Sequence, residues 1–364
     1  GTSRFMRRFM TQEMNLEKED MYQIDGPLDM TVFFGFCGIK GYDHLRYPEA
    51  HPHSPWSMLE LKRTSETNIF DMIREKDLLI HLPYESFDES VVNFLYSAAN
   101  DKDVLAIKQT LYRVSSSSPV VQALEKAVQN GKQVTVLMEV KARFDEANNI
   151  LMARRLEKAG AHVIYGLVGL KTHSKCTLVI RREQDGIRRY VHVATGNYNA
   201  STAKLYTDLG ILTCNDRFGI DASAFFNLLS GYSDPPIWDS FIVAPINLRQ
   251  RCIELIDREI HFAKNGEDAH MIAKMNSLLD KGIIEKLYEA SQAGVKIELI
   301  VRGICVLIPG IPGVSDNITV RSIVGRFLEH SRIFWFRNGG REELYISSAD
   351  WMPRNLNDRV ELMV

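Results

Sequence analysis

An internal repeat restricts the fold of this 364-residue chain more than any other feature of its sequence. Residues 124–134 and 287–297 follow one pattern, in which an amphipathic helix ends at a glycine and an apolar strand begins. Repetition of a helix–strand plan predicts two similar α/β halves in one chain.

Each half also carries a histidine followed two positions later by a cation, at the head of a strand-like run. The first pair is His173 and Lys175, and the second is His330 and Arg332. Residues two apart on a strand point to one side, so each ring shares a face with its cation. An imidazole nitrogen can attack phosphorus while the cation holds a phosphate oxygen. One such pair is a weak signal, but two in matching contexts predict a nucleophile with an anion clamp.

Turn signals place a small, polar segment opposite each histidine. Folding at the Asp-Gly turn of residues 185–186 brings residues 196–198 opposite residues 173–175, within one residue. An Asn-Gly turn occupies the corresponding place in the second half. We therefore expect Asn197 and its neighbours to close over His173.

Strand-like and helical segments alternate in the first half. Apolar runs at 104–107, 134–138 and 161–165 are separated by helical patterns, which predicts a largely parallel sheet. Ligands of such sheets bind beyond the carboxyl ends of the strands. Cations at these ends or beside a histidine would ring a shared cleft that both histidines face, where they could stabilise phosphate oxygens. They are Arg113, Arg143, Lys175, Arg302 and Arg332.

Composition restricts the function further. The net charge of −2 provides no global attraction for anions, so any phosphate site must be local. Five cysteines without a C-x-x-C pair argue against a disulfide framework or a zinc site and fit a reducing cytoplasm. No G-x-x-x-x-G-K-[ST] loop occurs, which excludes a P-loop kinase on that signature. The most apolar long run, residues 297–314, is interrupted by Arg302 and two prolines, so we expect a buried strand and loop.

Other histidines have simpler interpretations. His51 and His53 lie in a proline-rich stretch without further ligands at useful spacing, which indicates a linker rather than a metal site. His162 and His192 lie inside strand-like runs, where we expect residues of the packed core or of a strand face rather than catalysts.

Longer motifs resemble a known family. The duplicated histidine–cation pairs are similar to those of the phospholipase D superfamily, and the surrounding motifs resemble the bacterial polyphosphate kinase family, long-chain-synthesising type. The resemblance runs from about residue 16 to the end, and implies a C-terminal fragment without the N-terminal portion and extreme C-terminus of the family's longer chain. The motifs are residues 81–87, 107–113, 141–146, 169–175, 195–199, 205–208, 301–305 and 326–332.

The resemblance implies an α/β fold with two tandem phospholipase D-like domains and mixed sheets. We expect residues 1–55 to be the tail of a preceding helical domain with a linker. Residues 56–240 would form the first catalytic domain, with His173. Residues 241–364 would form the second, with His330, truncated at its C-terminus.

The resemblance also implies an activity: reversible, Mg²⁺-dependent transfer of the γ-phosphate of ATP to inorganic polyphosphate. His173 matches the phosphorylated histidine, His330 the second essential histidine, and Arg113 and Arg143 the magnesium–phosphate site. Nucleotide-contacting positions match Tyr206, Arg302 and His330. From the residues themselves we expect Lys175, Asn197 and Arg332 to hold phosphate.

The expected partners are ATP or ADP and polyphosphate, without nucleic acid. A homo-oligomer when full length and a cytoplasmic location, with peripheral association at the inner membrane, are further expectations from the family. Two alternatives stay open: a phospholipase D-like phosphodiesterase and a non-enzymatic polyanion-binding module. Against hydrolysis, Ile180 stands where those phosphodiesterases carry aspartate, and the second pair has Arg332 instead of lysine.

Overall fold

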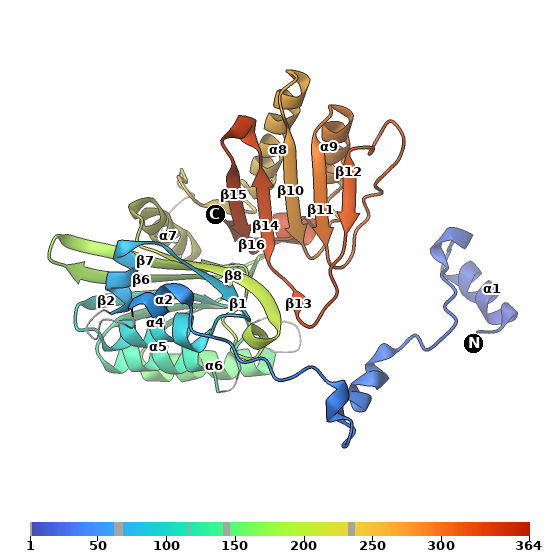
Figure 1. The fold of residues 1–364 in the computed structure, drawn as a ribbon. Coiled ribbons are helices and arrows are strands. Elements are labelled where there is room, and N and C mark those ends of the chain that lie inside the picture. Colours follow the sequence, from blue (N-terminus) through green and yellow to red (C-terminus); the bar gives the residue numbers. More distant parts are fainter. Residues whose placement is uncertain (1, 62–67, 116, 141–145, 232–236) are drawn as a thin grey trace. The chain divides into compact units, whose positions relative to one another are not determined.

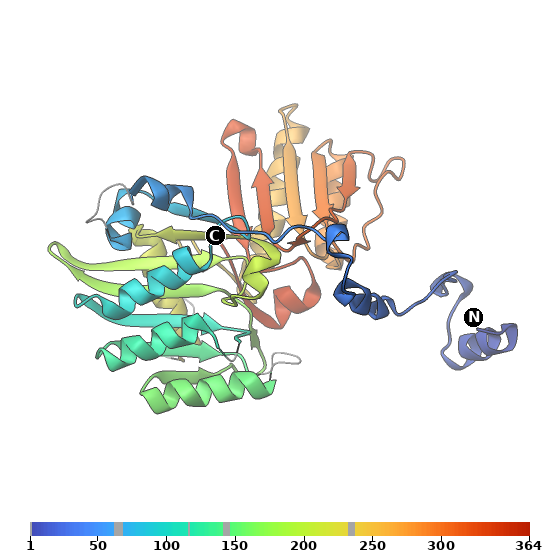
Figure 2. The ribbon, with the colours of Figure 1, turned by 60° about the horizontal axis from the view of Figure 1, so that its bottom comes forward.

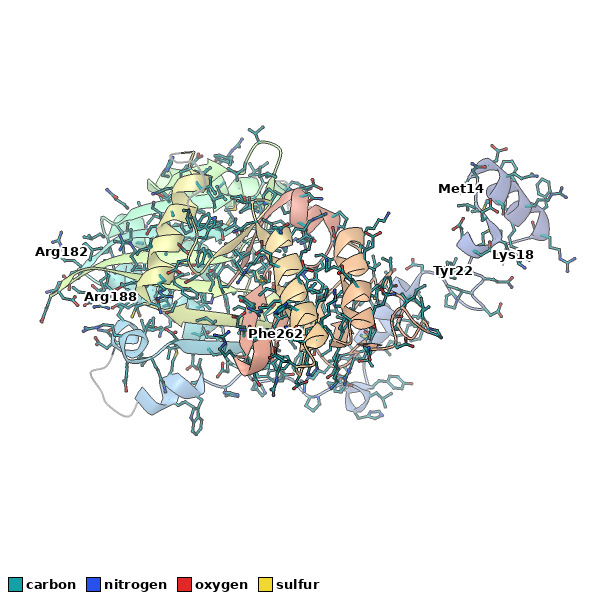
Figure 3. All side chains as sticks on the ribbon, turned by 90° about the horizontal axis from the view of Figure 1, so that it is seen from above. Met14, Lys18, Tyr22, Arg182, Arg188 and Phe262 are labelled. Atoms are coloured by element: carbon teal, nitrogen blue, oxygen red, sulfur yellow. The ribbon has the colours of Figure 1, made fainter. Side chains whose placement is uncertain are left out.

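The computed structural model describes residues 2–61, 68–115, 117–140, 146–231 and 237–364. Contacts divide the chain into two compact units, Gly1–Glu49 and Ala50–Val364. The first unit contains α1 (Arg4–Glu13) and three 3-10 helices, η1 (Lys18–Asp20), η2 (Met30–Gly38) and η3 (Asp43–Leu45). None of its described residues is buried, and Figure 3 labels three of them, Met14, Lys18 and Tyr22. Everything that concerns the site lies in the second unit.

The first sheet is mixed. Strands β2, β3 and β4 pair in parallel, whereas β6, β7, β8 and β1 continue the sheet with antiparallel pairs. The predicted parallel arrangement therefore holds only for the strands that alternate with helices. In spatial order the strands are β1 (Leu78–Leu82), β8 (Tyr206–Thr213), β7 (Gly186–Ala194), β6 (Cys176–Glu183), β2 (Val104–Leu111), β3 (Gln133–Met138) and β4 (His162–Tyr165).

Helices cover both faces of this sheet. Three of them, α4 (Asn93–Asn100), α5 (Pro119–Gln129) and α6 (Glu146–Ala159), lie on one face, as Figure 2 shows. On the other face, α7 (Asp216–Leu229) packs against apolar residues of β6 and β7 and of the second half. Shorter helices complete this half: α2 (Trp56–Leu61), α3 (Ile69–Glu75), η4 (Asp88–Val92) and η5 (Thr202–Lys204).

The second sheet repeats the plan with its own core. Helices α8 (Leu248–Lys264) and α9 (Lys281–Gln292) contribute to that core, and α10 (Pro353–Asn357) and η6 (Asn338–Gly340) lie in the connections. The predicted fold class, two tandem α/β halves with mixed sheets, is confirmed. The strands are β12 (Ile318–Arg321), β11 (Lys296–Val301), β10 (His270–Met275), β14 (Arg332–Phe336), β15 (Glu343–Ser347) and β16 (Arg359–Met363), with β9 (Ile242–Ala244) beside β16.

Each half lends a short strand to the sheet of the other. Strand β5 (Lys171–Thr172) pairs in parallel with β16 of the second half. Strand β13 (Leu328–Glu329) pairs in parallel with β8 of the first half, where Figure 1 shows it reaching across. The residue that follows each lent strand is one of the two predicted catalytic histidines.

The register of the β6–β7 hairpin corrects one prediction. Glu183 pairs with Gly186, so the turn lies at residues 184–185, and Ala194 donates its N–H to the carbonyl of Lys175 at 3.1 Å. The prediction placed Gly196 there and was wrong by two residues, because an Asp-Gly pair can occupy more than one position of a turn. Figure 3 shows Arg182 and Arg188 at the outer end of this hairpin.

The apolar stretch after β11 is a surface loop rather than the buried loop we expected. The side chains of Ile304 and Ile308 are 56% and 61% exposed. Across the described residues, no helix combines the length and apolar character needed to cross a membrane.

We predict that Asp221→Ala destabilises the connection into the second half. One carboxylate oxygen of Asp221 accepts the N–H groups of Asp239, Ser240 and Phe241 at 3.0, 2.6 and 2.8 Å. Loss of the acceptor for a buried donor, here the N–H of Phe241, costs about 1–3 kcal/mol. Urea unfolding should show this loss, with a smaller one for Asp221→Asn, which keeps an acceptor oxygen. An unchanged unfolding midpoint in the alanine variant would contradict the prediction.

Candidate active site

His173 is held at a junction of the two halves. Because β5 pairs with β16, the carbonyl of Val360 accepts the N–H groups of His173 and Ser174, both at 2.9 Å. This register places the imidazole beside Glu361, and Nδ1 lies 2.9 Å from each carboxylate oxygen. When Nδ1–H donates to the carboxylate, the lone pair of the ring is on Nε2. No hydrogen bond to Nε2 of His173 occurs among the described residues, so this nitrogen is available to a ligand.

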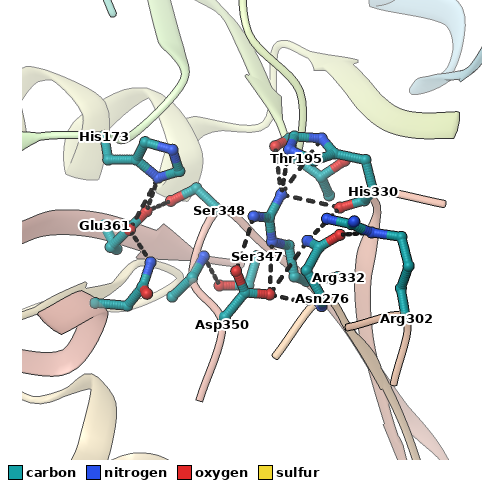
Figure 4. A network of polar contacts seen from close by, with 12 residues as sticks. His173, Thr195, Asn276, Arg302, His330, Arg332, Ser347, Ser348, Asp350 and Glu361 are labelled. Carbon is teal, nitrogen blue, oxygen red and sulfur yellow. Dashed lines mark hydrogen bonds and ion pairs between the residues drawn. The ribbon is translucent and has the colours of Figure 1, made fainter. Parts of the chain in front are cut away.

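Buried groups surround His173 and Glu361 and keep the imidazole neutral. The hydroxyl of Ser348 and the amide of Asn355 donate to Glu361 at 2.5 and 2.6 Å, which fixes its orientation (Figure 4). Burial, and then the charge of Lys175, lowers the pKa of His173 well below its usual value. A neutral imidazole with a free Nε2 is a nucleophile.

Lys175 is buried beside this ring. Its ammonium donates to the carbonyl of His173 and lies 5.6 Å from the ring centre of Tyr112, which in turn meets the imidazole edge-on at 4.8 Å. Burial lowers the pKa of Lys175 to about 7. A desolvated cation here is well placed to attract a phosphate oxygen.

His330 has the mirrored arrangement. Because β13 pairs with β8, its Nδ1 lies 2.9 Å from both carboxylate oxygens of Asp208 in the first half. The hydroxyl of Thr195 donates to the same carboxylate at 2.6 Å. Each histidine therefore takes its carboxylate from the opposite half of the chain.

Arg332 forms the centre of a second buried network, drawn in Figure 4. Its Nε and Nη2 donate to Asp350 at 3.2 and 3.0 Å, and Nη1 donates to the carbonyl of His330 at 2.9 Å. Asn276 links this network to Arg302, whose Nε donates to the Asn276 side-chain oxygen at 2.9 Å. Together with the hydrogen bonds around His173 and Lys175, this network brings cations from both halves into one region.

The remaining predicted residues fall into three groups. Tyr206 packs against His330 with 5.1 Å between ring centres, and Arg113 lies 5.5 Å from the ring centre of Tyr112, so both border the site. Asn197 has a buried side-chain oxygen without a hydrogen-bond partner among the described residues, so no hydrogen bond from this oxygen reaches His173. Arg143 lies outside the described residues.

Several residues of the site escaped the sequence analysis. Glu361 and Asp208, which orient the imidazoles, lie inside apolar strands, where a lone acidic residue was the available signal. Asn276 and Asp350, which hold Arg302 and Arg332, follow strands in the second half. Arg359, at the start of β16, contributes to the lowered pKa of His173, after burial and Lys175.

The described part of the chain contains no group of three His, Cys, Asp or Glu side chains arranged for a metal ion. Guanidinium groups carry only donors and cannot ligate a cation. Arg113 therefore suits the phosphate oxygens of a metal-bound substrate rather than the ion itself.

Comparisons with known proteins cover almost the whole chain. Residues 68–235 match the family described as Polyphosphate kinase C-terminal domain 1, and residues 241–364 match Polyphosphate kinase C-terminal domain 2. The chain is 56% identical to a polyphosphate kinase of Halalkalibacterium halodurans, over 98% of this chain and 50% of that protein. With a polyphosphate kinase of Lactiplantibacillus plantarum the identity is 52%, over 99% and 49%. The chain thus spans about half the length of the curated relatives it matches.

Solved structures agree with this likeness. The crystal structure of polyphosphate kinase from Porphyromonas gingivalis superposes with a TM-score of 0.84 at 36% identity, over 100% of this chain and 54% of that chain. A phosphatidylserine synthase of Haemophilus influenzae superposes with a TM-score of 0.51 at 11% identity, over 78% of this chain and 81% of that chain. The second likeness concerns the fold alone.

We predict that Gly196→Ala displaces the carboxylate of Asp208. A Cβ atom at position 196 would lie 2.3 Å from Asp208 Oδ2, a distance that no relaxed structure accepts. The hydrogen bond from His330 to Asp208 should weaken, and the proton on Nδ1 should exchange faster with water in NMR spectra. Gly282→Ala is the matched control, since its nearest neighbour lies at 3.5 Å. An unchanged Nδ1 signal in the Gly196 variant would refute this account.

We predict that Lys175 makes stability depend on pH. Its pKa is about 7 in the folded protein and 10.5 ordinarily, so between these values the unfolded chain binds more protons at this position. The free energy of unfolding should therefore rise with pH across that window. Lys175→Met should flatten the rise in urea unfolding at several pH values. Lys281→Met, at a side chain 88% exposed, should leave the slope intact; equal slopes in all three proteins would disprove the assignment.

Proposed function

Because the chain belongs to the polyphosphate kinase family, we propose that the whole protein transfers the γ-phosphoryl group of ATP reversibly to inorganic polyphosphate through a phosphohistidine on His173. The family assignment makes the chain part of a kinase enzyme. The nucleophile, the direction of transfer and the polyphosphate acceptor are our proposal.

One observation carries the choice of nucleophile. Nδ1 of His173 is engaged by Glu361, and Nε2 has no hydrogen-bond partner among the described residues. The lowered pKa of this buried imidazole supports a neutral ring, and so a lone pair, at neutral pH.

The proposed reaction has two steps. In the first, the Nε2 lone pair attacks the γ-phosphorus in line, the bond from phosphorus to the bridging oxygen breaks, and ADP leaves with the electron pair. Glu361 stabilises the positive charge that develops on the ring through the Nδ1 proton. In the second, a terminal oxygen of polyphosphate attacks the phosphorus, the nitrogen–phosphorus bond breaks, and His173 becomes neutral again. The same steps in reverse form ATP.

Cations would stabilise the charge on the transferred group. Phosphoryl transfer depends chiefly on positioning and on electrostatic stabilisation of the equatorial oxygens. We assign this role to Lys175 and Arg332, with Asn197 as a further phosphate contact. Arg113 and Arg143 would hold the remaining phosphates. Of these, Arg143 lies outside the described residues, and its assignment rests on its place after a predicted strand and on the family resemblance.

The nucleotide would lie on the His330 side of the site. Tyr206 borders His330, and Arg302 is fixed by Asn276, so an ADP leaving group on this side would meet an aromatic ring and a guanidinium group. His330 would serve as a second clamp beside the substrate.

Kinase chemistry of this family requires a divalent metal, and we propose Mg²⁺. This ion binds largely through substrate phosphates and retained waters, which suits a site whose carboxylates Asp208 and Glu361 already hold imidazoles. When bound, Mg²⁺ would neutralise part of the phosphate charge.

Other expectations from the family stay predictions. They are the limits of the terminal segment and the two catalytic domains, 1–55, 56–240 and 241–364, together with homo-oligomerisation and peripheral membrane association. Recognition of nucleic acid is not expected.

We predict that His173→Gln abolishes acid-labile labelling of the protein by ATP radiolabelled at the γ-phosphate. The glutamine removes the nucleophilic nitrogen, so labelling should fall by at least a factor of about 100, as for other lost nucleophiles. His162→Gln, at an exposed histidine of β4, is the control and should be labelled normally. Labelling that persists in the His173 variant would show that the nucleophile is elsewhere. Hydrolysis of a phosphodiester at a rate rivalling ATP use would favour the phosphodiesterase alternative.

A further inference from the structure

The two histidines are alike at Nδ1 and different at Nε2. In both rings Nδ1 faces a carboxylate at 2.9 Å. Nε2 of His173 has no hydrogen bond among the described residues, whereas Nε2 of His330 lies 3.2 Å from Nη1 of Arg332. The same guanidinium nitrogen lies 3.4 Å from Nδ1 of His330, so it lies against the ring as a whole.

The difference follows from the cation in each pair. Lys175 and Arg332 both donate to the carbonyl of the histidine two positions earlier. The lysine side chain ends at the ammonium group that makes this hydrogen bond. The guanidinium group of arginine has five N–H donors, and its further contacts reach the ring of the histidine. Arg332 is 3% exposed and is fixed by two hydrogen bonds to Asp350.

We propose that Arg332 restricts phosphoryl acceptance to His173 by covering the ring of His330. The inference rests on the proposed function, because it explains which of two similar histidines takes the phosphoryl group. A phosphorus atom must approach an attacking nitrogen to about 3–3.5 Å. At His330 the guanidinium group already occupies that distance from Nε2 and draws electron density from it. With its Nδ1–H held by Asp208 and its Nε2 facing Arg332, neutral His330 is left to position groups of the site rather than to take the phosphoryl group.

Phosphoramidate tests the reactivity of each ring without ATP. In this reaction the Nε2 lone pair forms a bond to phosphorus, the phosphorus–nitrogen bond of the donor breaks, and its protonated nitrogen leaves as ammonia. Mass spectrometry then locates the phosphohistidine. We expect label on His173 in the unchanged chain and none at either position in His173→Gln.

The decisive variant is His173→Gln combined with Arg332→Lys, which makes the second pair resemble the first. We expect label to appear on His330, at least tenfold above that in His173→Gln alone. The matched control combines His173→Gln with Arg341→Lys, an exposed arginine between β14 and β15, and should stay unlabelled. Label on His330 in His173→Gln alone would overturn the proposal, as would an unlabelled His330 in a double variant whose unfolding midpoint matches that of the control.

Imidazole ¹⁵N NMR of the unchanged chain gives a measurement that does not depend on the folding of any variant. The Nε2 signal of His330 should show an accepted hydrogen bond and that of His173 should not; two equivalent Nε2 signals would contradict the proposal. Parallel labelling with ATP separates the two hypotheses. If the phosphoramidate results hold while ATP labels neither histidine, the proposed function fails and the role of Arg332 stands.

Discussion

The reciprocal exchange of carboxylates between the halves is the constraint on which the site depends. Glu361 of the second half holds His173 of the first, and Asp208 of the first holds His330 of the second. Each exchange needs a lent strand, β5 or β13, whose parallel register sets the histidine beside its partner. Neither half could orient its own imidazole alone, so the packing of the halves against each other also determines the arrangement of the site.

Burial strengthens these interactions, and it also raises the cost of removing either partner. A buried charge is tolerated when it is paired and hydrogen-bonded, and removal of one partner leaves the other without compensation. Asp350 illustrates the balance: burial alone would raise its pKa, but Arg332 lowers the pKa to about 2. The hydroxyl of Ser348 and the amide of Asn355 likewise donate hydrogen bonds to the buried carboxylate of Glu361. The residues that support the histidines therefore matter as much to the site as the histidines themselves.

The halves share a plan but are not equivalent in chemistry. A lysine accompanies one histidine and an arginine the other, and this single difference changes what lies against each ring. A duplicated site can in this way assign acceptance of a phosphoryl group to one copy and leave hydrogen bonding to the other. The aromatic neighbours, in contrast, are of one kind, with Tyr112 beside His173 and Tyr206 beside His330.

The amino-acid sequence by itself determined the order of helices and strands, the existence of two halves, the two histidine–cation pairs and most of the surrounding cations. These features are local, since periodicity, glycine stops and strand ends span only a few residues. Only the tertiary structure decided which carboxylate meets which imidazole, because those partners are 188 and 122 residues apart in the chain. It also decided the hairpin register and the free Nε2 of His173, since both depend on where a strand pairs and which atoms surround a buried ring.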